Sequence, residues 1–275
     1  MIRTFLLGLI VALFSTQAMA QRILQVGREI LVRGTANAED VFVESFGNQL
    51  YVELSSSTLD EPLFDIFNAS DIRWVVIDTY GGDDTIFAER CKIRCFINSG
   101  PGEDQIFGSV RPDVIDGGGS NDVIFGGNGN DMLFGGPGFD SIDGGPHNDL
   151  IDGENGRDLL AGGDGSDIVM GGRAQDICVG GTFPEGSLST VQGIWFNTFV
   201  PFEIRIFSLV NAEILPVDDG DSDLIDGGDE GDVMVRDFGD EVIRDGFGWP
   251  GEISNPGVTD RVDFVFPDDF DFDAL

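Results

Sequence analysis

The chain has 275 residues and a formal net charge of −35 at pH 7. An acidic excess of that size disfavours nucleic acid and anionic membrane surfaces as partners, and favours cations, metal ions included. Hydrophobic residues make up 41% of the chain and 23 residues are Phe, which argues against disorder throughout. Three cysteines are too few for a scaffold built on disulfides.

Residues 1–20 read MIRTFLLGLIVALFSTQAMA, with one early Arg, an apolar run and a small-residue ending. This pattern predicts a secretory signal peptide that is cut before Gln21. The apolar run is too short to span a bilayer, and no other stretch is long and apolar enough, so we predict no membrane span in the mature chain. The predicted location is secreted or extracellular, with the periplasm as the open alternative.

Residues 21–78 are predicted to form ordinary strands that cap the rest of the fold. The segment DVFVESFGNQLYVEL alternates apolar and polar residues on both sides of Gly47-Asn48, which predicts a β-hairpin. The segment IRWVVIDT, ending at Thr79, is typical of a buried strand. No part of the mature chain has sustained helical periodicity, so we predict an all-β protein.

From residue 79 to residue 180 a nine-residue phrase repeats: two glycines, a spacer, a glycine, a spacer, an aspartate and a short apolar stretch. An earlier copy at Asp84 lies twenty residues before Asp104, two more than two copies need. The turn between Cys91 and Cys95 is expected to absorb this excess. The in-phase aspartates are Asp104, Asp113, Asp122, Asp131, Asp140, Asp149, Asp158, Asp167 and Asp176, and the second residue after each is apolar.

A segment of different character, residues 181–217, interrupts the repeats. It is rich in aromatic residues and has no aspartate between Thr182 and Pro216. The phrase resumes in a second repeat block, residues 218–244, at Asp223 and Asp232, and residues 245–275 form an acidic tail. The predicted order is therefore signal peptide, N-terminal β cap, repeats, aromatic insert, second repeat block and tail.

The phrases GGNGNDMLF, GGPGFDSID and GGDGSDIVM resemble the glycine- and aspartate-rich nonapeptides of the RTX (hemolysin-type) calcium-binding family. The resemblance covers about residues 79–180 and 218–244. It implies a parallel β-roll, a β-solenoid with two nonapeptides in each eighteen-residue coil, and several Ca²⁺ ions in the turns between neighbouring coils. We expect folding to be coupled to calcium binding.

The spacing of the acids gives an independent reason to expect metal. In such a roll, aspartates eighteen residues apart share an edge and lie about 4.8 Å apart. Two carboxylates near 5 Å repel by about 0.8 kcal/mol in water and about 3 kcal/mol at an effective dielectric of 20. Calcium takes about six to eight oxygen ligands at roughly 2.3–2.6 Å, so one ion can bridge two coils while turn carbonyls complete its shell. The alternative is that each aspartate merely caps its turn.

The repeat aspartates are therefore the predicted metal ligands. Departures from the phrase weaken the prediction at some turns: Asp113 lacks its second and fourth glycines, and Asp149, Asp176 and Asp223 lack the fourth. The predicted ligands are Asp84, Asp104, Asp113, Asp122, Asp131, Asp140, Asp149, Asp158, Asp167, Asp176, Asp223 and Asp232.

No catalytic constellation accompanies the repeats. The only histidine is His147, in a repeat turn, which excludes an HExxH zinc site, and no GxSxG elbow is present to support a Ser-His-Asp triad. We predict calcium binding without enzymatic activity. Two alternatives stay open: a calcium-stabilised adhesin or matrix protein that binds a protein or polysaccharide surface, and a carbohydrate-active enzyme on a β-solenoid.

Two further expectations concern the surface and the core of the roll. Phe87, Phe107 and Phe125 follow the inward apolar position on successive coils of one side, which predicts an outward aromatic stripe. We expect the aromatic insert or the N-terminal hairpin to cover it. The two cysteines of the Cys-Lys-Ile-Arg-Cys turn can pair in an oxidising compartment, a question left open, and Cys178 is expected to be a buried free thiol.

Overall fold

A computed structural model describes residues 22–182 and 223–227, together with the backbone of four short strands at 233–236, 241–243, 252–254 and 263–265. The predicted signal peptide and most of the aromatic insert lie outside the described residues. Within them the structure is almost entirely β, with a single 3-10 turn, Ala69–Asp71. None of its helices has the length and apolar character needed to cross a bilayer, as far as the described residues go.

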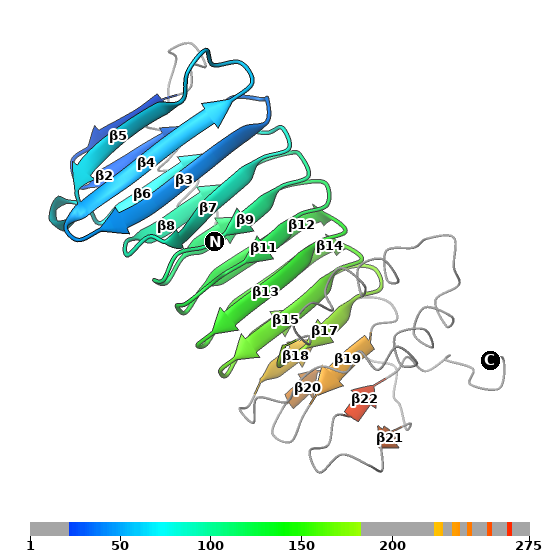
Figure 1. Ribbon diagram of the computed structural model, residues 1–275. Coiled ribbons are helices and arrows are strands. Elements are labelled where there is room, and N and C mark those ends of the chain that lie inside the picture. Colours follow the sequence, from blue (N-terminus) through cyan, green and yellow to red (C-terminus); the bar gives the residue numbers. More distant parts are fainter. Residues whose placement is uncertain are drawn as a thin grey trace.

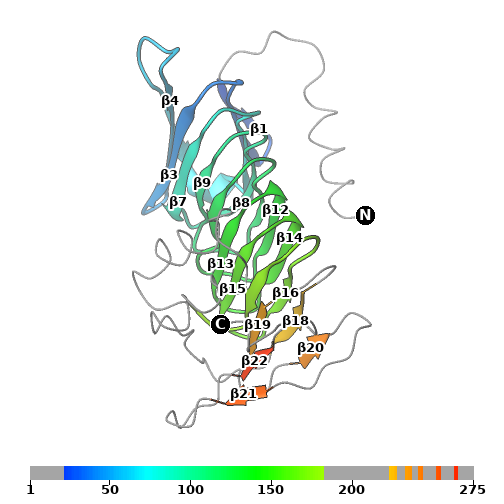
Figure 2. The same cartoon turned by 90° about the vertical axis from the view of Figure 1, so that its right-hand side faces the viewer.

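Two sheets face each other along an elongated solenoid (Figure 1). Seen from the side, the turns at both edges carry the chain from one sheet to the other (Figure 2). In spatial order the ten-stranded sheet consists of β1 (Arg22–Val26), β2 (Glu29–Arg33), β6 (Trp74–Asp78), β8 (Arg94–Asn98), β10 (Val114–Asp116), β12 (Met132–Gly138), β14 (Leu150–Gly156), β16 (Ile168–Met170), β18 (Leu224–Asp226) and β20 (Glu241–Ile243).

The opposite sheet has twelve strands, and its pairing is parallel except at its two ends, where β3, β4 and β5 and then β19, β22 and β21 run antiparallel. In spatial order it consists of β5 (Leu63–Asn68), β4 (Gln49–Ser56), β3 (Glu39–Phe46), β7 (Thr85–Arg90), β9 (Gln105–Phe107), β11 (Val123–Phe125), β13 (Ser141–Pro146), β15 (Leu159–Asp164), β17 (Ile177–Val179), β19 (Val233–Arg236), β22 (Asp263–Val265) and β21 (Glu252–Ser254).

Each regular coil of the solenoid takes eighteen residues. Ile115 lies opposite Leu133 in the ten-stranded sheet, and Ile106 lies opposite Ile124 in the twelve-stranded sheet. Two nonapeptides therefore complete one coil, which confirms the predicted parallel β-roll. The first coil is longer: Ile86 pairs with Ile106 across the predicted twenty-residue interval.

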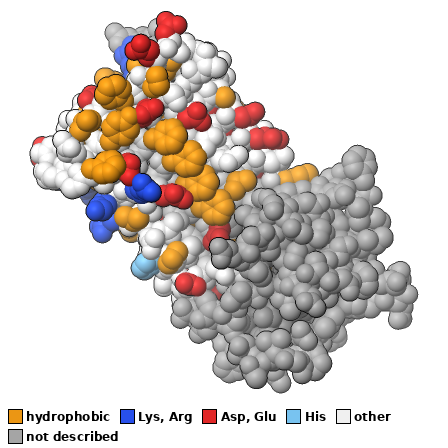
Figure 3. Space-filling model, viewed as in Figure 1, with side chains coloured by type: hydrophobic (Ala, Val, Ile, Leu, Met, Phe, Trp, Pro, Cys, Tyr) orange, Lys and Arg blue, Asp and Glu red, His pale blue; other side chains and the backbone are white. Residues whose placement is uncertain are grey.

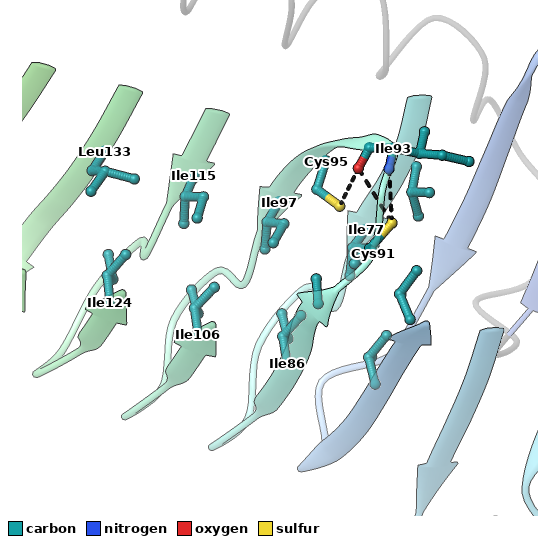
Figure 4. Close-up of a cluster of buried hydrophobic side chains, with 14 of the residues drawn as sticks. Ile77, Ile86, Cys91, Ile93, Cys95, Ile97, Ile106, Ile115, Ile124 and Leu133 are labelled. Carbon is teal, nitrogen blue, oxygen red and sulfur yellow. Dashed lines mark hydrogen bonds between the residues drawn. The ribbon is translucent and has the colours of Figure 1, made fainter. Parts of the chain in front are cut away.

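The core is a double row of apolar side chains, one from each nonapeptide, between the two sheets (Figure 4). Strand alternation turns the middle residue of each short strand inward, so a nonapeptide has only one position for a large core residue. The inward residues are at most 3% exposed: Ile86, Ile97, Ile106, Ile115, Ile124, Leu133, Ile142, Ile151, Leu160, Val169, Cys178 and Ile225. The buried position expected for Cys178 is confirmed.

The N-terminal strands extend both sheets beyond the first repeat. β2 pairs in parallel with β6, with Ile30 opposite Val75, and β3 pairs in parallel with β7. The predicted hairpin is present, with Phe46 opposite Gln49 across Gly47-Asn48. Because the hairpin continues the twelve-stranded sheet, it lies beside the repeats and does not fold over them.

The solenoid continues on the far side of the aromatic insert. Val169 of β16 lies opposite Ile225 of β18, and the peptide N–H of Asp167 donates to Asp223 at 2.7 Å although the two are 56 residues apart in sequence. Regular partners are eighteen residues apart. The intervening chain therefore interrupts the sequence pattern without changing the register of the coils.

The predicted aromatic stripe is confirmed, and it is longer than expected. Phe87, Phe107 and Phe125 stack with ring centroids 5.1 Å apart. Phe42 of the hairpin adds a fourth ring, 5.0 Å from Phe87. The hairpin was one of the two covers expected for this stripe, and that expectation is wrong, because the hairpin extends the stripe (Figure 3). The other expected cover, the insert, lies outside the described residues.

Deletion of residues 184–214 is predicted to cause calcium-dependent aggregation. Leu159 and Ala161 flank the inward Leu160 and so face outward on β15, yet each is only 1% exposed. Ile177 and Val179 repeat this on β17, at 3% and 1% exposure. We expect the insert to cover this outward apolar face, so its deletion should expose the face once calcium folds the roll. Light scattering of the deletion variant with calcium and with chelator checks this, and a variant that stays monomeric in calcium would exclude the insert as the cover.

Candidate metal sites in the turns

The repeat aspartates form two continuous rows, one at each edge of the solenoid. In each row the peptide N–H of one aspartate donates to Oδ1 of the aspartate on the next coil, at 2.7–2.9 Å. Every carboxylate is at most 3% exposed. The first row is Asp84, Asp104, Asp122, Asp140, Asp158 and Asp176, and the second row is Asp113, Asp131, Asp149, Asp167 and Asp223.

The sequence period positions these side chains. Each aspartate closes a turn and immediately precedes a strand, as Asp122 precedes Val123 of β11. Parallel pairing in register then stacks equivalent residues on successive coils, so that a period of eighteen puts every second aspartate on the same edge. Eleven of the twelve predicted ligands are brought into the rows in this way, whereas Asp232 lies outside the described residues.

In five aspartates of the two rows the second carboxylate oxygen has no such donor. Oδ2 is buried and accepts no hydrogen bond in Asp122, Asp131, Asp140, Asp149 and Asp158. A charged oxygen in that position has lost its water without gaining a replacement, which is costly unless a cation takes the place of the water. These oxygens therefore mark where a cation would stabilise the fold most.

The glycines of each turn leave room beside that oxygen. A Cβ on Gly135 would stand 2.5 Å from Oδ2 of Asp140 and 3.0 Å from the carbonyl oxygen of Gly153, one coil further on. The next residue, Gly136, has a φ of +104°, and a Cβ there would meet the carbonyl oxygen of Gly118 at 1.9 Å. The repeated glycines thus bring a carboxylate oxygen and peptide carbonyls from neighbouring coils close together.

Burial dominates the electrostatics of the rows. Loss of hydration raises the pKa of Asp122 and of Asp158 from 3.8 to about 9, that of Asp149 to about 8, and those of Asp131 and Asp140 to about 7. Neighbouring carboxylates of the same row raise the pKa further at Asp122, Asp149 and Asp158. Without a cation, several of these groups therefore keep a proton at neutral pH.

Oxygen atoms make up the available donor set. Among the described residues no three His, Cys, Asp or Glu side chains gather around one point. A metal ion in a turn would thus take Asp carboxylates from a row and complete its shell with backbone carbonyls. Hard oxygen ligands of this kind suit calcium, whereas magnesium requires a tighter octahedron and keeps its waters. The residues present fit calcium.

Asp113 differs from the other members of its row. Its Oδ2 accepts the Ser109 N–H at 2.6 Å, and its Oδ1 accepts the Ser109 hydroxyl at 2.9 Å and the Cys95 N–H at 2.6 Å. The carboxylate is therefore satisfied by its own turn, although burial still raises its pKa to about 6. The sequence signal for this difference is Ser109, which stands where the phrase has its second glycine.

Two other irregular turns keep a positive φ angle at the fourth position of the phrase. His147 and Ala174 replace the fourth glycine, yet both adopt positive φ angles, +89° and +80°. The Asp149 N–H still donates to Asp167 at 2.7 Å. Neighbouring coils thus impose the turn on residues that disfavour it, at a cost in backbone strain.

The first row begins before the repeats, which the sequence reasoning missed. The N–H of Glu39, at the start of β3, donates to Oδ1 of Asp84 at 2.7 Å. The Glu39 carboxylate is 2% exposed and accepts the Thr35 hydroxyl at 2.6 Å. Glu39 lies 45 residues before Asp84 and outside any nonapeptide, so no periodic signal could have found it.

Comparison with protein families identifies the repeats. The model of the RTX calcium-binding nonapeptide repeat matches residues 98–133, 125–160 and 152–183. Neither the curated proteins nor the solved structures gave a match to this chain. RTX nonapeptides bind Ca²⁺ in a β-roll, and several consecutive copies imply several ions. The β-roll of this chain is therefore built, over residues 98–183, from the calcium-binding nonapeptide repeats of the RTX family.

Proposed function

We propose that this chain is an exported calcium-binding protein whose β-roll folds as calcium fills its turns. The observation that carries the proposal is the pair of rows of buried carboxylates, whose Oδ2 atoms accept no hydrogen bond at positions such as Asp122, Asp140 and Asp158. Export is supported by the leader pattern of residues 1–20.

The two oxygens of each carboxylate have different surroundings, which supports coupling between calcium binding and folding. Oδ1 of Asp140 holds the neighbouring coil through the Asp122 N–H at 2.8 Å, while Oδ2 faces the glycine turn of its own coil. A bound calcium ion supplies the positive charge that makes burial of the ionised carboxylate favourable. The same side chain would therefore join adjacent coils and hold the ion. Calcium binding would then favour pairing of the coils, and pairing of the coils would favour calcium binding.

Replacement of a central aspartate is predicted to lower calcium uptake strongly. Asp140 has a row neighbour on each side, because its N–H donates to Asp158 at 2.9 Å and its Oδ1 accepts from Asp122. Asp140→Asn keeps the shape but removes the charge, so it should weaken the sites on both sides of its coil. Isothermal titration calorimetry with calcium, at equal protein concentrations, measures the number of ions bound and their affinity.

Two matched variants make this prediction specific. Asp65→Asn removes an exposed carboxylate outside the rows and should leave calcium uptake unchanged. Asp113→Asn removes a carboxylate that already has three donors, and should reduce uptake less than Asp140→Asn does. Equal losses in all three variants would contradict ligation by the rows.

A further inference from the structure

The second row of aspartates runs along one edge of the solenoid. In the first turn at this edge, two cysteines occupy positions at which the following turns have other residues. In β8, Cys95 aligns with Asp113, since the following residues Phe96 and Val114 lie opposite each other. The Cys95 N–H donates to Oδ1 of Asp113 at 2.6 Å, as the Asp113 N–H donates to Oδ1 of Asp131 at 2.7 Å. Cys95 therefore occupies the aspartate position of its turn.

Cys91 occupies the position of Ser109 in the same alignment. The Val110 N–H donates to the Cys91 carbonyl at 3.1 Å, just as the Asn128 N–H donates to the Ser109 carbonyl one coil further on at 3.3 Å. Cys91 and Cys95 therefore stand at the same two positions of their turn as Ser109 and Asp113 do in the next turn.

The conformation of these turns brings the second and sixth positions of the nine-residue phrase into contact. In the turn of Asp113, the Ser109 hydroxyl lies 2.9 Å from Oδ1 of Asp113, and it also accepts the Arg111 N–H at 3.0 Å. In the equivalent contact of the preceding turn, the sulfur of Cys91 accepts the Ile93 N–H at 3.4 Å. The backbone conformation that joins serine to carboxylate in one turn is therefore repeated around the cysteine pair.

Both thiols reach the same backbone oxygen. The Cys91 thiol donates to the Ile93 carbonyl at 3.3 Å, and the Cys95 thiol lies 3.6 Å from the same oxygen (Figure 4). Both side chains are fully buried. Both are free thiols in this structure, and their shared approach to the Ile93 carbonyl places them on the same side of one tight turn. A disulfide needs Cβ atoms about 3.5–4.5 Å apart, a separation that one tight turn can provide.

We propose that Cys91 and Cys95 form a disulfide, which closes this turn covalently where the following turns use a carboxylate. The proposal rests on export to an oxidising compartment, because cytosolic thiols stay reduced. The cross-link would hold the longer first coil, which joins the β cap to the regular repeats, independently of calcium. Cys178 belongs to β17, in the later coils of the roll, and takes no part.

The chemistry is thiol–disulfide exchange with a small-molecule disulfide as oxidant. The Cys91 thiolate attacks one sulfur of the oxidant, which releases one small thiol and leaves a mixed disulfide. The Cys95 thiolate then attacks Sγ of Cys91 and releases the second small thiol. The two protein thiols lose two electrons and two protons in total, and the oxidant gains them as it becomes two thiols. Because both thiols are buried in the folded roll, the exchange takes place as the turn closes during folding.

Thiol counting on the full chain tests the proposal. The protein is folded in calcium with oxidised glutathione, denatured, labelled with N-ethylmaleimide and weighed by intact mass spectrometry, before and after reduction. Of the three cysteines, we expect only Cys178 to be labelled before reduction and all three to be labelled after it. Labelling of all three before reduction would overturn the proposal, and so would glutathione retained on Cys91 or Cys95.

The variant Cys178→Ser removes the remaining ambiguity, because pairing of Cys178 with another cysteine would also leave one free thiol. In this variant we expect no label before reduction, whereas labelling of either remaining cysteine would overturn the pair. Calcium titration of the same samples tests the proposed calcium function separately from the proposed disulfide. Calcium uptake without the disulfide would leave the proposed calcium function intact, and the disulfide without calcium uptake would leave the cross-link intact.

Discussion

Removal of calcium at neutral pH is expected to unfold the repeat region. Each nonapeptide directs one large apolar side chain, such as Ile124 or Leu133, into the core between the sheets, which contributes about 1.5–3 kcal/mol. Nine residues must be ordered for each such side chain, so the conformational entropy of the backbone opposes folding of this thin core. Backbone hydrogen bonds offset part of this entropic cost, but burial of the carboxylates in the two rows destabilises the fold further. Without a cation, the balance should favour the unfolded chain.

Circular dichroism checks this result with one sample carried through three conditions. Chelator should remove most of the β signal, and calcium added back at about 10⁻⁴–10⁻³ M, the range of extracellular calcium modules, should restore it. Magnesium at the same concentration is the matched control, and it should restore much less, because it demands a tighter octahedral shell and keeps its waters. Identical spectra with chelator and with calcium would refute coupled folding.

The parts of the fold that the sequence predicts are those that repeat. A spacing of nine between aspartates and apolar residues specifies both the core position and the edge of each acid, because strands in register stack identical positions. The stacked rings of Phe87, Phe107 and Phe125 follow from the same rule. The solenoid on the far side of the insert also follows it, since Asp223 continues the row of Asp167.

The parts that could not be predicted depend on contacts between segments with no common period. Glu39 starts the first row from β3, and Phe42 extends the aromatic stripe from the N-terminal hairpin. Neither residue belongs to a nonapeptide. Sequence reasoning also expected the acids to line the edges and to be destabilised mainly by mutual repulsion. The structure buries them, so that loss of hydration is the first cause of the raised pKa of Asp122, ahead of its neighbours' charges.

The metal-free protein is expected to become more stable as the pH falls. Burial raises the pKa of Asp122 and Asp158 in the folded roll from 3.8 to about 9, and that of Asp131 to about 7. A group whose pKa is higher in the folded state binds its proton more tightly there, so its contribution is complete below the unfolded pKa and is lost as the pH rises through the folded value. The stabilisation should therefore be lost progressively between about pH 4 and pH 9, and each carboxyl contributes on the order of a few kcal/mol.

Calcium-loaded protein should show the opposite slope, because calcium binds the ionised carboxylates and protons compete with it. Thermal unfolding of dialysed, metal-free protein and of calcium-loaded protein, each measured across this pH range, gives two curves that should converge in acid and separate at neutral pH. High salt is the control, since it screens the exposed acids but not the buried rows of Asp122 and Asp131. A metal-free slope that disappears in high salt would assign the effect to surface charge. A midpoint that falls with acid in both samples would show that the buried carboxylates are ionised without calcium, which removes the physical reason for coupling folding to the metal.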